Sequence, residues 1–132
     1  TILDPEDDAA SANWGGYWRM PTNEEWTALG NTENFTWTRT SDYQSTGTAG
    51  VIVTSKIAGY EGNSIFLPTA GYRVGSSHYW DESDLGYSCF FWSSSLYTNR
   101  SSFAWHMSFD WTGIFISYRG RCLGYSIRPV CD

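Results

Sequence analysis

The chain has 132 residues and a formal net charge of −6, and 18% of its residues are Phe, Trp or Tyr. This length favours a single domain. No apolar run approaches the ~20 residues of a membrane-spanning helix, so we expect no direct insertion into a membrane. The acidic balance without a Lys/Arg cluster argues against nucleic-acid binding, because phosphate contacts need clustered positive charge.

Two short helices are predicted near the start of the chain. Asp4 and Pro5 favour the first helix start, as the capping residue and the first helical residue, and Gly15 would end that helix. Thr22 and Glu25 have the spacing of a capping box, in which each residue bonds the backbone of the other. We therefore expect a second helix to begin just after Thr22.

Short strands and turns are predicted for the rest of the chain. Residues 35–40 alternate with period two, and residues 51–54 and 64–67 are β-rich runs. Residues 61–64, with the sequence EGNS, suit a hairpin turn. The predicted class is α+β and loop-rich, with two short N-terminal helices packed on small antiparallel sheets.

A further strand is predicted near residue 106, where polar and apolar residues alternate. One face would be exposed and would carry His106, Ser108 and Asp110. The other would be buried and would carry Met107, Phe109 and Trp111. The same phase turns a second row outward, namely Ile114, Ile116 and Tyr118. An exposed row of this kind suggests a contact patch, although both Ile residues could instead pack under a loop.

Ordered motifs along almost the whole chain resemble one family. Residues 14–22 (WGGYWRMPT) followed by Glu25-Trp26 are similar to a signature of bacterial proteins related to formylglycine-generating enzyme. Residues 66–73 and 124–130 resemble later blocks of the same family. The resemblance implies a C-type-lectin-like fold for a single domain over residues 1–132.

The C-terminal block is similar to that of variable proteins of diversity-generating retroelements. In that family, mutated codons at variable positions cannot encode Lys, Gln, Glu, Met or Trp. Residues 1–82 contain six Glu, one Lys and one Gln, whereas residues 83–132 contain none of these three types. The resemblance implies a scaffold over 1–86, a variable ligand-binding region over 87–125 and a closing strand over 126–132.

The expected function is non-enzymatic binding of a macromolecular ligand, either a protein or a glycan, by this diversified region. Tyr and Arg, which dominate binding hot spots, are frequent there. The predicted ligand-binding residues are Phe90, Tyr97, Arg100, Ser102, Phe103, His106, Ser108, Asp110, Ile114, Ile116, Tyr118, Arg119, Cys122, Leu123 and Tyr125. The family pattern implies that Arg121 and Arg128 are structural anchors. We expect Trp92 and Trp105 to be mostly buried scaffold, and Tyr118 and Arg119 to be exposed.

Three other interpretations were weighed. Residues 81–84 (DESD) could ligate calcium, but a solvated acidic loop is favoured and the sugar-binding calcium motifs of C-type lectins are missing, so no metal or cofactor is expected. A formylglycine-generating-type oxidase would need a reactive Cys pair, which Cys89 and Cys122 do not convincingly match. A structural subunit or lipoprotein domain of a bacterial surface assembly would predict an exposed face without the Tyr, Arg, Phe and Ile residues expected here.

The family resemblance implies display on a bacterial surface, outside the cell, or on a phage.

Overall fold

Short strands dominate the computed structural model, which describes residues 1–79 and 88–132. Its helices are α1 (Ala9–Trp14) and α2 (Asn23–Leu29), with a 3₁₀ turn at Tyr43–Ser45. Its strands are β1 (Trp18–Arg19), β2 (Phe35–Thr40), β3 (Gly50–Ser55), β4 (Ser64–Pro68), β5 (Tyr72–Val74), β6 (Ser77–Tyr79), β7 (Cys89–Leu96), β8 (Phe103–Asp110), β9 (Gly113–Gly120), β10 (Leu123–Gly124) and β11 (Val130–Cys131).

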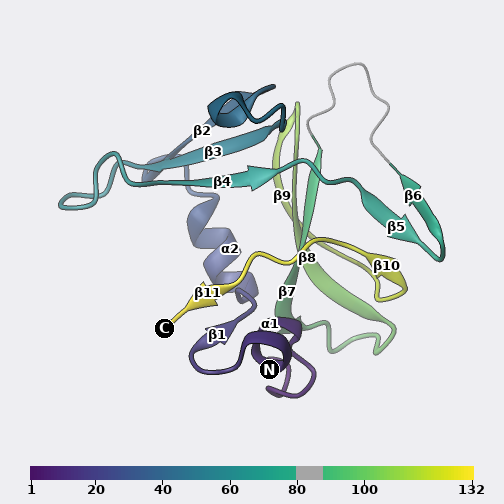
Figure 1. The fold of residues 1–132 in the computed structure, drawn as a ribbon. Coiled ribbons are helices and arrows are strands. Elements are labelled where there is room, and N and C mark those ends of the chain that lie inside the picture. Colours follow the sequence, from purple (N-terminus) through teal and green to yellow (C-terminus); the bar gives the residue numbers. More distant parts are fainter. Residues whose placement is uncertain (80–87) are drawn as a thin grey trace.

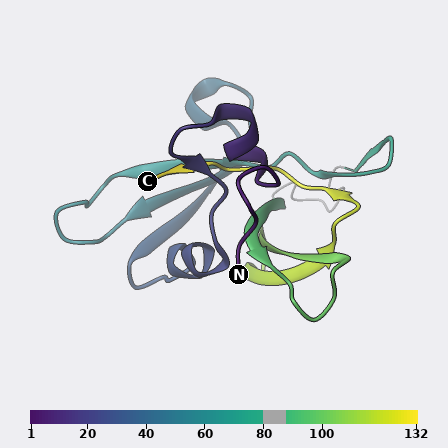
Figure 2. The same cartoon turned by 90° about the horizontal axis from the view of Figure 1, so that it is seen from below.

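These strands form small antiparallel sheets in the orders β2-β3-β4, β7-β8-β9, β10-β5-β6 and β1-β11. The chain is therefore a small mixed α/β domain with few helices and several small antiparallel sheets. Figure 1 shows β7, β8 and β9 running through the middle of the molecule, with β2, β3 and β4 crossing near one end of them. Seen from below, the N-terminus lies beside the β7-β8-β9 sheet (Figure 2).

The strands expected at residues 35–40, 51–54 and 64–67 are confirmed as β2, β3 and β4. Thr38 pairs with Ile52, and Ile52 pairs with Phe66, so the three strands form a continuous antiparallel meander. The turn predicted at residues 61–64 closes the β3–β4 hairpin, where the Ser55 amide donates to the Asn63 carbonyl at 2.8 Å.

The first helix starts later than predicted. Asp8, not Asp4, caps α1, because its carboxylate accepts from the amides of Ala10 and Ser11 at 2.9 and 3.1 Å. The same carboxylate accepts the Met20 amide at 2.9 Å. This contact with the residue after β1 is a tertiary interaction that favours Asp8 over Asp4, and residues 5–7 form a turn instead.

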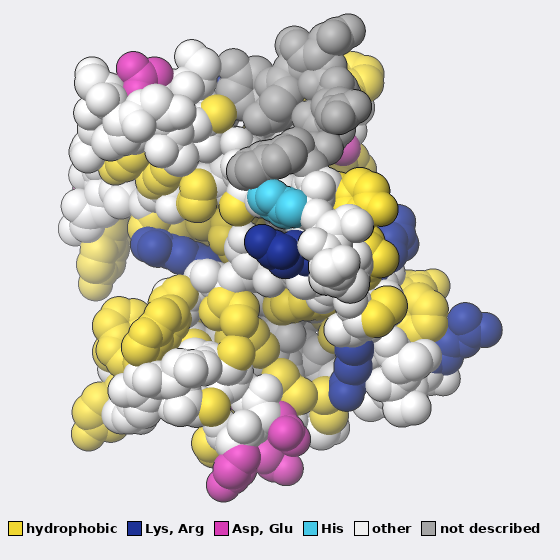
Figure 3. Space-filling view, turned by 45° about the vertical axis from the view of Figure 1, so that its right-hand side comes forward, with side chains coloured by type: hydrophobic (Ala, Val, Ile, Leu, Met, Phe, Trp, Pro, Cys, Tyr) yellow, Lys and Arg dark blue, Asp and Glu magenta, His cyan; other side chains and the backbone are white. Residues whose placement is uncertain are grey.

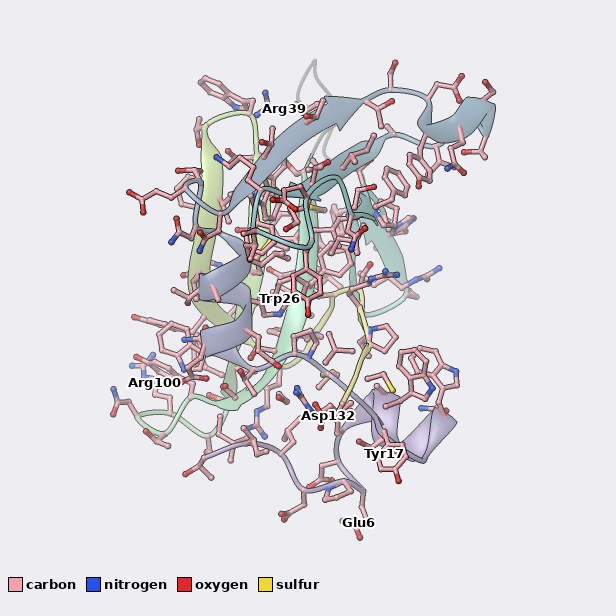
Figure 4. The ribbon with its side chains drawn as sticks, turned by 90° about the vertical axis from the view of Figure 1, so that its left-hand side faces the viewer. Glu6, Tyr17, Trp26, Arg39, Arg100 and Asp132 are labelled. Carbon is pink, nitrogen blue, oxygen red and sulfur yellow. The ribbon has the colours of Figure 1, made fainter. Side chains whose placement is uncertain are left out.

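The capping box predicted at the start of α2 is confirmed. The Thr22 side chain accepts from the Glu25 amide at 3.2 Å, and the Glu25 carboxylate accepts from the Thr22 amide at 2.8 Å. This start orients the helix so that Trp26, which is 2% exposed, points into the interior (Figure 4). Its indole N–H donates to the Trp92 carbonyl at 3.4 Å, which ties α2 to β7.

The hydrophobic core lies between α2, the β2-β3-β4 sheet and one face of the β7-β8-β9 sheet. Its buried members come from all three elements: Trp26, Val51, Val53, Leu67, Cys89, Phe91, Met107 and Phe109. Trp37 of β2 stacks on Phe109 of β8 with ring centroids 5.2 Å apart. The core therefore covers one end of the central sheet and fixes how that sheet lies in the fold.

An ion-pair network joins β1, α2 and the C-terminal residue. Arg19 donates to Glu25 at 2.7 and 2.8 Å and to Asp132 at 2.6 Å. The hydrogen bonds from Arg19, opposed in part by burial, lower the pKa of Glu25 to about 2. The arrangement fixes the last residue of the chain beside the start of α2 (Figure 4).

Candidate ligand-binding surface

The β7-β8-β9 sheet carries most of the predicted contact residues, and its register places each one on one of two faces. Met107 of β8 pairs with Phe91 of β7 and with Ile116 of β9, whereas His106 pairs with Trp92. Directly paired residues share a face of a sheet, and neighbours along a strand alternate. We name the face of Met107 the inner face, because it meets the core, and the face of His106 the outer face.

The predicted orientation of two Ile residues is wrong at the core end of the inner face. Met107 and Phe109 are 0% and 4% exposed, as expected. Ile114 and Ile116, predicted to point outward, instead pack against the core beside them. The cause is the register, since Ile114 pairs with Phe109 and Ile116 with Met107. A two-residue turn reverses the chain here, and its position set the phase of β9.

Trp111 lies in that turn, between β8 and β9, and is 63% exposed. Its predicted burial is wrong because the strand ends at Asp110. The Asp110 carboxylate accepts from the Thr112 amide at 2.7 Å and from the Gly113 amide at 3.2 Å. Asp110 is half-buried and shapes the turn, instead of being fully exposed as predicted.

His106 on the outer face is 3% exposed, so its predicted exposure is wrong. It belongs to the Tyr125 cluster, which we define as Phe90, Trp92, His106 and Tyr125. The Tyr125 ring lies 4.5, 5.0 and 5.1 Å from the rings of Trp92, Phe90 and His106. Tyr125 thus covers a face that the alternation of β8 had marked as solvent-facing.

The C-terminal segment holds Tyr125 in this position. The Ser126 amide donates to the Phe90 carbonyl, and the Trp92 amide donates to the Ser126 carbonyl, both at 3.0 Å. Burial, with a smaller effect of Arg119, lowers the pKa of His106 to about 4. His106 is therefore neutral at pH 7, and its Nδ1 has no hydrogen-bond partner in the described part of the chain.

A second group of rings lies on the inner face, at the end nearer the β7–β8 loop. This Tyr97 cluster consists of Tyr97, Phe103, Trp105 and Tyr118. Tyr97 stacks on Tyr118 with ring centroids 4.1 Å apart, and Trp105 meets both rings edge-on at 5.4 and 5.7 Å. A hydrogen bond to Tyr97 raises the pKa of Tyr118, which is 39% exposed.

Two arginines contact Phe103 of this cluster. The Arg100 guanidinium lies over the Phe103 ring at 5.5 Å from its centroid, and Arg100 projects from the loop end of the sheet (Figure 4). Arg119 is exposed, as predicted, but it pairs with Ala104 and so lies on the outer face. Arg121 donates from Nε to the Phe103 carbonyl at 3.2 Å, which fits an anchoring role. Within residues 1–79 and 88–132, neither Arg121 nor Arg128 forms an ion pair.

The predicted contact residues therefore fall into separate groups. The Tyr97 cluster and the Tyr125 cluster lie on opposite faces of the sheet, and two Ile residues belong beside the core. Of the remaining positions, Ser102 and Cys122 are exposed and Leu123 is half-buried. Ser108, predicted to be exposed, is also half-buried, and it pairs with Phe90 in the sheet. Trp92 and Trp105 were expected to be mostly buried, but both are half-buried. Each contacts the rings of its cluster and remains partly exposed to solvent.

The sequence argument gave no surface role to one aromatic patch. Trp14, Tyr17 and Trp18 are 58%, 76% and 43% exposed, and Trp14 meets Trp18 edge-on at 6.4 Å. Their place in the family signature had suggested scaffold. Figure 3 shows that hydrophobic side chains also reach the surface in several patches on the side that carries β5, β6 and β10.

No group of three or more His, Cys, Asp or Glu side chains is placed to hold a metal ion in the described segments. The acidic residues 81–84, considered above for calcium, lie outside the described residues. None of the described helices is long and apolar enough to cross a membrane.

Comparison with known proteins gives one match. Residues 40–130 match the family described as "Domain of unknown function (DUF8237)". This chain belongs to that family. The match covers β3 to β10 in full and so includes both ring clusters and most of the core. No curated protein and no solved structure matches the chain.

Proposed function

We propose that this DUF8237 domain is a non-enzymatic ligand-binding domain with a C-type-lectin-like fold. The Tyr97 cluster and Arg100 form the centre of its contact surface for a protein or glycan ligand. The carrying observation is the stacking of Tyr97 on Tyr118 at 4.1 Å, which leaves Tyr118 39% exposed. Rings held by one another lose little conformational entropy when a ligand binds, so they suit a recognition surface.

The surroundings of the cluster support this role. Arg100 adds a positive charge over the Phe103 ring, and Tyr and Arg are the residue types most enriched in binding hot spots. The Tyr125 cluster contributes less to contact in this proposal, because Tyr125 and the C-terminal segment cover it. It fixes the strands from behind the contact surface.

The proposal extends to the family resemblance. Residues 87–125 would be the diversified region of a retroelement variable protein, displayed on a bacterial surface or on a phage particle. A non-enzymatic role is supported by Cys89, whose thiol is 0% exposed. Burial raises the pKa of that thiol to about 12, which opposes formation of the thiolate that cysteine chemistry requires.

The test uses a phage-displayed random-peptide library and a glycan array as probes of the whole chain. Ligands selected on the wild type are then measured against Tyr118→Ala and Arg100→Ala, with Tyr60→Ala as the control. Tyr60 is 64% exposed in the β3–β4 connection, outside the proposed surface. We expect about tenfold or greater loss of affinity for the first two variants, as for hot-spot truncation, and no change for the control. The proposal fails if the selected ligands bind both cluster variants with the same affinity as the wild type, or if neither probe yields a ligand.

A further inference from the structure

A hollow of ≈ 350 Å³ lies between the N-terminal segment and the β7-β8-β9 sheet. Its lining contains apolar, hydroxyl and charged side chains, including Leu3, Asp7, Trp92, Ser93, Ser95 and Arg121. No residue of the Tyr97 cluster lines it. The hollow therefore shares no ring with the proposed contact surface, although Trp92 of the Tyr125 cluster lines it and Arg121 joins it to the backbone of Phe103.

The N-terminal segment is fixed over this hollow by backbone hydrogen bonds. The Leu3 amide donates to the Ser94 carbonyl at 2.8 Å, and the Leu96 amide donates to the Thr1 carbonyl at 3.0 Å. These contacts fall where the β7–β8 register shifts between Trp92 and Leu96. Such irregularities re-aim side chains and are frequent beside functional sites. Ser93 and Ser95, which lie within this irregular stretch, line the wall of the hollow.

Two buried serines in this wall have a hydrogen-bond donor to spare. Ser93 and Ser95 are 3% and 8% exposed. The Ser93 hydroxyl oxygen accepts the Ser95 amide at 3.0 Å, and the Ser95 hydroxyl oxygen accepts the Asn23 amide at 2.8 Å. Each hydroxyl also carries one proton to donate. The described residues supply no acceptor for either proton, so both are available to an acceptor in the hollow.

Opposite charges line the same hollow without neutralising each other. Asp7 belongs to the N-terminal segment, and Arg121 follows β9. Within the described chain these two side chains form no ion pair. Arg121 uses Nε for the Phe103 carbonyl, and its two terminal nitrogens have no protein partner in the same part of the chain. A guanidinium in this state presents a fork that matches a carboxylate.

We propose that this hollow binds a free α-amino acid with an apolar side chain. The ligand carboxylate accepts from Arg121 and from the hydroxyls of Ser93 and Ser95. The ligand ammonium group lies toward Asp7, and its side chain contacts the apolar wall that includes Leu3 and Trp92. Each charged group of the ligand thus meets an opposite charge, and the proposal does not depend on ligand binding at the Tyr97 cluster.

Isothermal titration calorimetry of the whole chain tests the assignment with L-leucine and L-phenylalanine as probes. N-acetyl-leucine lacks the ammonium charge, and leucine amide lacks the carboxylate. We expect binding of the free amino acids at millimolar concentration or below. Each modified ligand should bind about tenfold or more weakly, because a charge-assisted hydrogen bond is lost. Since this comparison uses the wild-type chain, it does not depend on whether a variant folds.

Variants then locate the site. Asp7→Asn and Arg121→Gln should each weaken leucine binding about tenfold or more, because each removes one charged partner. Asp4→Asn and Arg73→Gln are matched controls, because neither residue lines the hollow, and they should leave binding unchanged. The proposal is overturned if neither amino acid binds, if N-acetyl-leucine and leucine amide bind as tightly as leucine, or if the control variants weaken binding as much as the lining variants.

Discussion

The two ring clusters of the central sheet contain similar residues but differ in what covers them. Tyr125 and the C-terminal segment lie over the outer face, where His106 is 3% exposed. On the inner face, the Tyr97 cluster leaves Tyr118 39% exposed and Arg100 projecting from the loop. Ring content alone therefore does not distinguish packing from recognition. Coverage by segments distant in the sequence makes the distinction.

This difference in coverage implies different roles for the two clusters of the sheet. The covered cluster uses its rings to exclude water from a neutral histidine, and its contribution should appear in stability. The open cluster uses ring-on-ring stacking to hold side chains at the surface, and its contribution should appear in binding.

A fully packed ring sets the upper end of the scale. Phe109 is 4% exposed and stacks on Trp37 at 5.2 Å. Replacing Phe109 by Ala should lower the free energy of unfolding by about 3–5 kcal/mol, because it removes buried surface and leaves a cavity. Urea denaturation followed by circular dichroism measures the change. A loss under about 1 kcal/mol, the size expected for a surface substitution, would contradict the placement of Phe109 in the core.

Acid should destabilise the covered cluster through His106. Its folded-state pKa of about 4 lies below the ordinary value of 6.5, so the unfolded chain takes up the proton first as the pH falls. The free energy of unfolding should be unaffected above pH 6.5 and should decrease between pH 6.5 and 4, by up to about 3 kcal/mol. Glu25, with a pKa of about 2, contributes its loss at lower pH.

Denaturant melts across this pH range should separate the two histidines. His106→Gln should flatten the pH dependence between 6.5 and 4.5, whatever its effect on absolute stability. His78→Gln is the matched control and should retain the dependence. If stability falls equally with pH in the wild type and in His106→Gln, the protected neutral histidine is not the cause.

The smallest expected effect compares one tyrosine from each cluster. Tyr125→Ala should cost about 2 kcal/mol, less than a fully buried ring, because Tyr125 is half-buried against four aromatic neighbours. Tyr118→Ala should cost under about 1 kcal/mol, as for an exposed position. Thermal melts of both variants provide the comparison. A larger cost for Tyr118→Ala would place the Tyr97 cluster among the packing residues and remove it from the contact surface.

Local sequence signals predicted several parts of the fold correctly. The Thr22–Glu25 capping box and the β2-β3-β4 meander depend on residues that are near one another in the sequence, so local patterns could predict them. The alternation in β8 also divided its residues correctly into two faces. Tyr97 and Phe103 were named as contact candidates because they lie in the segment that resembles a variable region, and the structure brings their rings within 6.4 Å of each other.

The sequence by itself determined which residues of one strand share a face, because the backbone of a strand alternates with period two. It did not determine which faces of neighbouring strands match, because that depends on the register. Only the tertiary structure decided which face is covered. Ser126, hydrogen-bonded to the backbone of β7, brings Tyr125 over His106, and the two-residue turn after Asp110 aligns Ile116 with Met107. Burial depends on what packs from elsewhere in the chain, and no local periodicity encodes that. Local sequence patterns also did not reveal the hollow between the N-terminal segment and the β7-β8-β9 sheet, because its Asp7 and Arg121 come from opposite ends of the sequence.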